Sequence, residues 1–204
     1  MIGKICRVFV IFLVAISMPV WAGGDAVKDY RQQEKEEITE YLKQQMQEAK
    51  AFSESLKGMP AAEKKKVIIA HREAQYEKGR LLRRQKHEEY MVLLKERLAK
   101  NDKLTQDEKN AIISFFESQY KEDMEFLDKQ HVENMAFFEQ ITRDTKMIRA
   151  ARREAIRDYF KKQKEENREH SRIQLAENKA ETEKIRSEIE VKTEKGSGTR
   201  RGGG

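Results

Sequence analysis

The stretch that decides the fold is residues 104–138, LTQDEKNAIISFFESQYKEDMEFLDKQHVENMAFF. It contains neither glycine nor proline, and Thr105 followed by Glu108 has the spacing of a capping box, with Leu104 before it as a hydrophobic staple. Inside it the apolar, aromatic and histidine positions advance by about 3.67 residues on average, at 116, 120, 124, 127, 131, 135 and 138. This eleven-residue pattern predicts one long helix with a straight or slightly right-handed packing seam.

Related patterns lie 44 residues away along the chain. A shift of 44 relates Tyr76 to Tyr120 and His87 to His131, and a further shift continues the pattern into residues 155–163. Because 44 is four elevens, such a repeat preserves the seam. We interpret the repeating unit as a break followed by one long helix. Chance similarity among helices rich in Lys, Glu and Gln is the alternative.

Three breaks divide the chain into helices. Gly58 followed by Pro60 is typical of a helix end and the next helix start, and residues 100–105 contain the turn before the capping box. A weaker break at residues 142–145 has capping residues but no glycine or proline, so the chain either bends there or continues straight. The expected helices are near residues 26–57, 60–100, 105–142 and 145–190.

The composition favours an all-α fold. Of the 204 residues, 38% are charged and 38% hydrophobic, with only two prolines and ten glycines. A β-sandwich needs more turn residues, and a doubly wound α/β fold needs several apolar strands. A narrow seam cannot bury a large globular core. We therefore expect elongated long-helix hairpins or a coiled-coil-like bundle, associated as an oligomer and most simply as a homodimer.

The first 22 residues have the features of an export signal. Lys4 and Arg7 precede an apolar run over residues 8–20, and the small or apolar residues of a cleavage site end at Ala22. The run is shorter than the ~20 residues that span a bilayer. Residues 1–22 are thus predicted to be a Sec signal peptide, with an uncleaved anchor as the alternative. The processed protein would be periplasmic or otherwise exported, without a stable membrane span.

Processing would leave an elongated all-helical domain over residues 23–195 and a disordered Gly/Arg tail over residues 196–204. This chain loses Cys6, the only cysteine, and so can form no disulfide and no thiolate metal site. It carries 40 lysines and arginines against 36 acidic residues, a net charge of +4 mixed along the chain. Nucleic-acid-binding proteins usually have a stronger basic stripe, so we expect no nucleic acid to be bound.

No motif typical of catalysis or cofactor binding is found. The sequence has no Gly-rich phosphate loop, no G-x-S-x-G motif and, after processing, no thiol nucleophile. We predict that the protein is not an enzyme and binds no cofactor. His87 and His131 are interpreted as packed seam histidines. As a metal site they are weak candidates only, because they would have to meet across a hairpin.

Adjacent apolar and aromatic residues are the most suggestive functional feature. An adjacent pair spans about 100° of a helix, so both members cannot point into one narrow seam. Either the helices pack against two neighbours, or one member of each pair is exposed. In the second case an apolar surface edged with basic residues would hold protein partners or unfolded clients. Its expected residues are Arg80, Leu81, Leu82, Arg83, Arg84, Phe115, Phe116, Phe137 and Phe138.

The export signal, the cysteine-free processed chain, the helical hairpins and the Leu104-Thr105-x-x-Glu108 motif resemble the Spy/CpxP family of small periplasmic proteins. In that family an LTxxQ motif opens a long helix, and Glu108 stands where the family usually has glutamine. The resemblance implies a cradle-shaped antiparallel dimer that acts as an ATP-independent chaperone or envelope-stress protein. A related branch of the family implies a response to metal.

Three functions therefore stand as hypotheses. The first is an exported, non-enzymatic client-binding protein of Spy/CpxP type. The second is a structural coiled-coil spacer or assembly subunit of the cell envelope, in which the paired aromatic residues are all buried. The third is a periplasmic metal-responsive sensor that uses His87 and His131.

Overall fold

The computed structural model describes residues 25–143 and 147–198. The predicted signal peptide, residues 1–22, lies outside the described residues. In the described ranges the chain forms four helices and no strand: α1 Asp25–Ser55, α2 Ala61–Ala99, α3 Gln106–Arg143 and α4 Arg149–Gly198. The all-α prediction is confirmed. None of these helices is both long enough and apolar enough to cross a bilayer.

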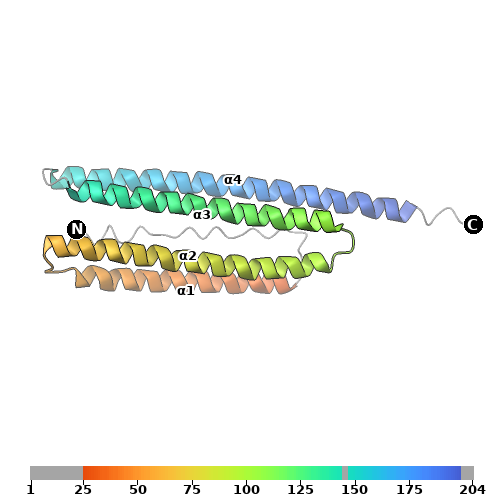
Figure 1. Ribbon diagram of the computed structural model, residues 1–204, viewed down its shortest axis with the longest axis horizontal. Helices are drawn as coiled ribbons and strands as arrows, with labels where there is room; N and C mark the ends of the chain where they lie inside the picture. The colour runs from red at the N-terminus through yellow and green to blue at the C-terminus, as the bar shows by residue number, and fades with distance from the viewer. Residues whose placement is uncertain (1–24, 144–146, 199–204) are drawn as a thin grey trace, which may run out of the picture.

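Consecutive helices run antiparallel and lie side by side, so the molecule is long and narrow (Figure 1). The α2 and α3 helices form the central hairpin, α1 lies along α2, and α4 lies along α3. The α1–α2 turn lies at the same end of the molecule as the end of α3 and the start of α4. With 50 residues, α4 is about 75 Å long at about 1.5 Å per residue.

The first two breaks have the local structure that the sequence predicts. Gly58 ends the first turn with a φ of +76°, a left-handed conformation that glycine adopts without strain. Pro60 then caps α2, where its carbonyl accepts a hydrogen bond from the amide of Lys64 at 2.8 Å. At the second break, the amide of Thr105 donates to Glu108 Oε2 at 2.7 Å and the amide of Glu108 donates to Thr105 Oγ1 at 3.3 Å. These reciprocal bonds confirm the capping box.

The third break is a reversal of the chain. Of the two alternatives, bending and running straight through, the structure has the first, because α3 ends at Arg143 and α4 returns alongside it from Arg149. At its other end α4 continues to Gly198 instead of stopping near residue 190, so it enters the segment that was expected to be a disordered tail. Residues 199–204 lie outside the described ranges.

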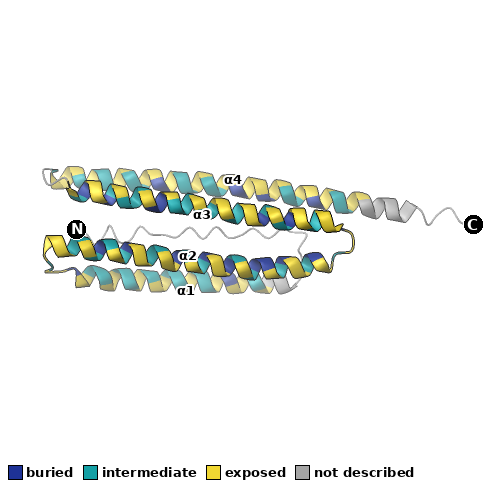
Figure 2. Ribbon diagram, in the orientation of Figure 1, coloured by how far each residue is buried: buried dark blue, intermediate teal, exposed yellow. Residues whose placement is uncertain are grey.

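The predicted seam of α3 faces the neighbouring helices. Phe116, His131 and Phe138 are buried, and the seam positions between them, 120, 124, 127 and 135, are half-buried. In Figure 2 the buried and half-buried residues follow such stripes, while exposed residues cover the remaining surface. The apolar interior is therefore narrow, as a seam of this width requires.

Two apolar clusters hold the helices together, one toward each end of the molecule. The larger one contains residues from α2, α3, α4 and the turn at Leu104: Tyr90, Met91, Leu94, Leu98, Leu104, Ile112, Phe116 and Ile185. Tyr30 of α1 packs against the same cluster, so all four helices meet there. The smaller cluster lies near the α1–α2 turn and contains Leu56, Ile68 and Phe138. Between these clusters the helices are held mainly by polar and aromatic contacts.

Candidate binding surface and the contacts between helices

The nine residues predicted to bind clients do not form one exposed surface. Arg83, Phe116 and Phe138 are buried, with at most 8% of each residue exposed. Leu81 and Arg84 are exposed. The remaining four are half-buried: Arg80, Leu82, Phe115 and Phe137. The surface prediction is therefore corrected for the three buried residues, which cannot touch a client on the folded protein.

Arg83 is buried because α2 lies between α1 and α3. Burial lowers the pKa of its guanidinium. The charge of Asp123 on α3 raises this pKa and so offsets part of the shift, and Tyr41 on α1 and Tyr120 on α3 make smaller contributions in the same direction. The contributions come from both neighbouring helices. The positive charge of Arg83 therefore serves contacts inside the molecule.

The adjacent rings of Phe137 and Phe138 face different helices. The guanidinium carbon of Arg72 on α2 lies 4.5 Å from the ring centroid of Phe138. Phe137 stacks on Tyr159 of α4, with ring centroids 3.9 Å apart. An angular separation of about 100° between neighbouring residues allows α3 to contact both helices in this way. For this pair, the first of the two alternatives expected from the sequence holds: the helix packs against two neighbouring helices.

The other adjacent pair belongs to the larger apolar cluster. Phe116 is buried and meets Tyr90 of α2 edge to face, with ring centroids 5.3 Å apart. Phe115 is half-buried and packs against the same cluster, edge to face with Phe116 at 5.2 Å. Edge-to-face pairs of this kind stabilise a core beyond the area that they bury.

Each of the four histidines stacks on an aromatic ring of a neighbouring helix. The ring centroids are 3.7 to 4.0 Å apart in four pairs: His71 on Phe52, His87 on Tyr120, His131 on Tyr76 and His170 on Phe126. The pairs join α1 to α2, α2 to α3 twice, and α3 to α4. This is the packed arrangement expected for His87 and His131.

The electrostatic surroundings of the histidines differ. His131 Nε2 lies 3.0 Å from Glu73 Oε2, and His170 Nε2 lies 2.8 Å from Asp123 Oδ1. For His71 and His87, burial lowers the pKa of the imidazole, and nearby glutamates offset only part of that effect. The partial burial of His71 and His87 therefore favours the neutral ring.

A metal ion shared by His87 and His131 does not fit this geometry. His131 stacks on Tyr76, which lies eleven residues before His87 on the same helix. At 1.5 Å per residue that separation is about 16 Å, whereas two ligands of one zinc ion each lie about 2 Å from it. Among the described residues, no three His, Cys, Asp or Glu side chains are grouped as metal ligands. The two rings thus do not meet across the hairpin.

The contact between α3 and α4 is largely polar. Over residues 149–191 the buried side chains of α4 are Gln163, Gln174, Asn178 and Ile185, of which only the last is apolar. Gln163 Nε2 donates to Glu133 Oε2 at 3.4 Å, and Gln174 Nε2 donates to the backbone oxygen of Gln119 at 3.5 Å. Long polar contacts of this kind give less stability than an apolar seam.

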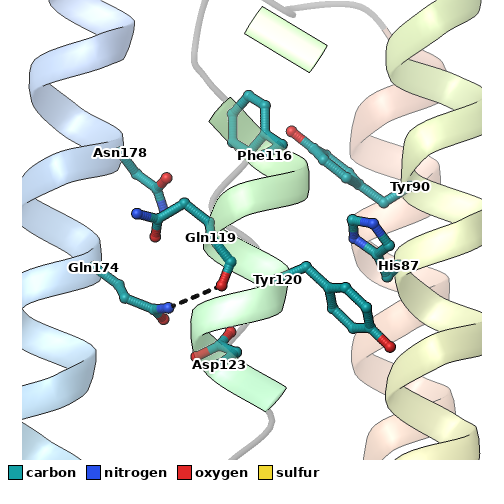
Figure 3. A pocket seen from close by; sticks show the side chains of 8 residues that line it. All are labelled: His87, Tyr90, Phe116, Gln119, Tyr120, Asp123, Gln174 and Asn178. Carbon is teal, nitrogen blue, oxygen red and sulfur yellow. Dashed lines mark hydrogen bonds between the residues drawn. The ribbon is translucent and has the colours of Figure 1, made fainter. Parts of the chain in front are cut away.

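A cavity of about 30 Å³ lies in this polar seam, where residues of α2, α3 and α4 converge (Figure 3). Gln119, Gln174 and Asn178 line it toward α4, and His87 and Tyr120 line it toward α2. The side-chain oxygens of Gln119 and Asn178 are buried without a hydrogen-bond partner. The volume corresponds to roughly one water molecule and is far below the ~300 Å³ of a small-molecule pocket.

Two polar contacts that join α2 to its neighbours are not predicted by the sequence pattern. Lys86 is buried and pairs with Glu37 of α1 and with Glu89, whose Oε2 lies 2.7 Å from its ammonium group. The hydroxyl of Tyr76 donates to Asp128 of α3. A single eleven-residue seam does not include position 86. Because α2 packs against both α1 and α3, its buried face is wider than one seam. A pattern that allowed for two neighbours would have included Lys86.

Comparison of the chain with models of protein families, with curated proteins and with solved structures finds no match.

Proposed function

We propose that the protein is an exported, non-enzymatic spacer or assembly subunit of the cell envelope. The observation that carries this proposal is the packing of the aromatic residues. Phe116 and Phe138 are buried, Phe137 stacks on α4, and Phe115 packs on the larger cluster. A client-binding surface would need these rings to be exposed together, whereas a spacer needs them to hold its helices in one arrangement.

Contacts distributed along the helices support the proposed role. The stacked histidines and the ion pair of Lys86 with Glu37 join neighbouring helices at several levels. Such contacts resist sliding of one helix along another, because each fixes the register of two helices. A narrow array of long helices thereby keeps a fixed distance between its ends.

We also propose that α2 and α3 derive from one duplicated helix. Tyr76 of α2 stacks on His131 of α3, and His87 of α2 stacks on Tyr120 of α3. A shift of 44 exchanges these two pairs, as two copies of one helix packed antiparallel would require. We further propose that the spacer is a homodimer, which analytical ultracentrifugation of the processed chain tests.

The polar contact of α4 favours a second candidate, the client-binding function implied by the Spy/CpxP resemblance. Within residues 149–191, α4 buries one apolar side chain, Ile185, and three polar ones. If α4 separated from α3, the half-buried rings of Phe126 and Phe137 would become accessible to an unfolded chain. In this alternative the binding surface exists only in an opened form.

Site-specific photo-cross-linking in an exporting host tests the spacer proposal. A photoreactive residue replaces Ala62 or Asp102 near the two ends, or Leu81 or Glu125 near the middle of α2 or α3, all of which are exposed. A spacer predicts a discrete adduct from an end position and none from the middle. Many adducts from the middle positions, increasing after heat shock, would contradict it and support client binding.

A further inference from the structure

One end of the molecule is strongly basic, whereas the other end is nearly balanced in charge. Residues 50–72, 132–143 and 147–157 lie at the end that contains the α1–α2 turn, and they hold eleven lysines and arginines against five glutamates. Residues 25–37, 95–110 and 175–198 lie toward the other end, with thirteen basic residues against fifteen acidic ones. Basic and acidic residues are mixed along the sequence, but the fold brings basic segments together at one end.

Packing contacts bring the segments of the basic end together. The smaller apolar cluster joins Leu56, Ile68 and Phe138, which come from α1 and its turn, from α2 and from α3. Phe137 and Tyr159 add α4 through their stack. The basic residues near these positions therefore gather at one end of the molecule.

Several basic side chains of this end reach solvent, although Arg72 is buried against the ring of Phe138. Lys66, Arg149 and Arg153 are exposed, and Lys64 and Lys65 are half-buried. Within the described part of the chain, no carboxylate lies in salt-bridge range of Lys64, Lys65 or Lys66. The positive potential of the three lysines is thus available to an external anion.

An apolar side chain projects from the same end. Ile148, directly before α4, is 70% exposed, the largest fraction among the exposed large apolar side chains of the described residues. Met59 lies half-buried in the α1–α2 turn. An isoleucine among lysines and arginines matches an interfacial membrane contact, in which basic residues approach anionic headgroups and an apolar residue enters the acyl boundary.

We propose that the basic end docks on the surface of a bilayer that contains anionic lipid. The helices would then extend away from the membrane, with the opposite end outward. Exposed Ile148 favours a lipid surface over a soluble polyanion, because an anionic polymer offers this side chain no apolar environment. The proposal does not depend on the spacer function, since a client-binding protein could be held in the same orientation.

Vesicle flotation tests the proposal with the processed chain purified after export. The probes are vesicles of phosphatidylcholine alone and vesicles with about one third phosphatidylglycerol. Each basic residue near an anionic surface contributes roughly fivefold in affinity. The triple variant Lys64→Gln, Lys65→Gln, Lys66→Gln should therefore bind the anionic vesicles about 100-fold more weakly.

A matched variant removes the same charge at the other end: Lys100→Gln, Lys103→Gln, Lys109→Gln. It should bind anionic vesicles as the unchanged protein does, and circular dichroism should show both triple variants folded. Equal losses in the two variants would overturn the proposal, because attraction would then follow net charge and not the basic end. Binding to dextran sulfate without binding to anionic vesicles would also overturn it.

Ile148→Trp provides an independent reading of insertion, because the processed chain has no other tryptophan. Its fluorescence should shift to shorter wavelength with anionic vesicles and should be quenched by brominated lipid. An unshifted, unquenched signal from protein that floats with the vesicles would contradict the membrane-surface geometry.

Discussion

Phe116 is the residue whose substitution best separates internal packing from client binding. Its ring is 4% exposed and lies against Tyr90 and Phe115 in the cluster where the four helices meet. Phe116→Ala removes this ring and leaves a cavity that rigid helices close only in part. Substitutions of this type lower the free energy of unfolding by about 3–5 kcal/mol.

The expected change in melting temperature follows from the size of the protein. For a domain of this length, about 1 kcal/mol shifts the midpoint by roughly 2–4 °C. Phe116→Ala should therefore lower the midpoint by about 10 °C, measured by far-ultraviolet circular dichroism and by urea denaturation. Leu81→Ala, at a site that is 55% exposed, is the matched control and should change stability by no more than about 0.5 kcal/mol.

The opposite pattern would refute the packing argument. If Phe116→Ala left the free energy of unfolding within about 1 kcal/mol of the unchanged protein but abolished capture of an unfolded client, the ring would serve an external surface. If Leu81→Ala were the more destabilising change, the assignment of inner and outer faces on α2 and α3 would be wrong.

Three other changes test separate parts of the structure. Asn178→Leu should raise the free energy of unfolding by about 1 kcal/mol in urea denaturation, because it replaces a buried side-chain oxygen without a partner by an apolar group; destabilisation would argue against the unpaired state. Gly58→Ala should lower the melting temperature by an amount equivalent to about 1 kcal/mol, because alanine is strained at a φ of +76° although nothing lies within 4 Å of its added Cβ; an unchanged midpoint would argue against the left-handed turn. Because burial lowers the pKa of His71 and His87 in the folded protein, the stability that their neutral rings contribute is fully present above the ordinary value of 6.5 and is lost as the pH falls below it. Thermal melts between pH 7.5 and 5 should show this decline, weakened in His71→Gln, His87→Gln; an equal decline in that double variant would exclude the two rings as its source.

The sequence was most informative where one local rule acts alone. Gly58 with Pro60, and Thr105 with Glu108, mark two helix boundaries because each pair has a distinct backbone role. The spacing from Phe116 to Phe138 likewise predicted the inner face of α3. These features depend on residues within one or a few helical turns of each other, so they can be predicted from the sequence alone.

The site was less predictable because it depends on how many neighbours each helix has. With one neighbour, Arg83 and one ring of each aromatic pair would be exposed. With α1 and α3 on either side of α2, Arg83 becomes buried. Likewise α4 gives Phe137 a partner in Tyr159. The accumulation of positive charge at one end could not be predicted without the fold, because residues 50–72 and 147–157 are far apart in sequence.

The end of α4 shows a further limit of local patterns. Glycine and serine at positions 196–198 favour the end of a helix, yet the helix includes them. The start of the same helix at Arg149 has no glycine or proline before it, so the reversal there is set by the packing of α4 along α3 and not by a strong turn signal.

Suppression of aggregation tests whether the aromatic residues pack internally, as in a spacer, or bind unfolded chains. The processed chain is mixed, without ATP, with an equimolar amount of an unfolding client, and light scattering is followed. For a spacer, scattering should rise as in the client alone, while the protein remains a folded, elongated species. Suppression at that ratio, lost in a variant whose α4 is disulfide-linked to α3, would contradict the spacer proposal and assign client binding to the opened form.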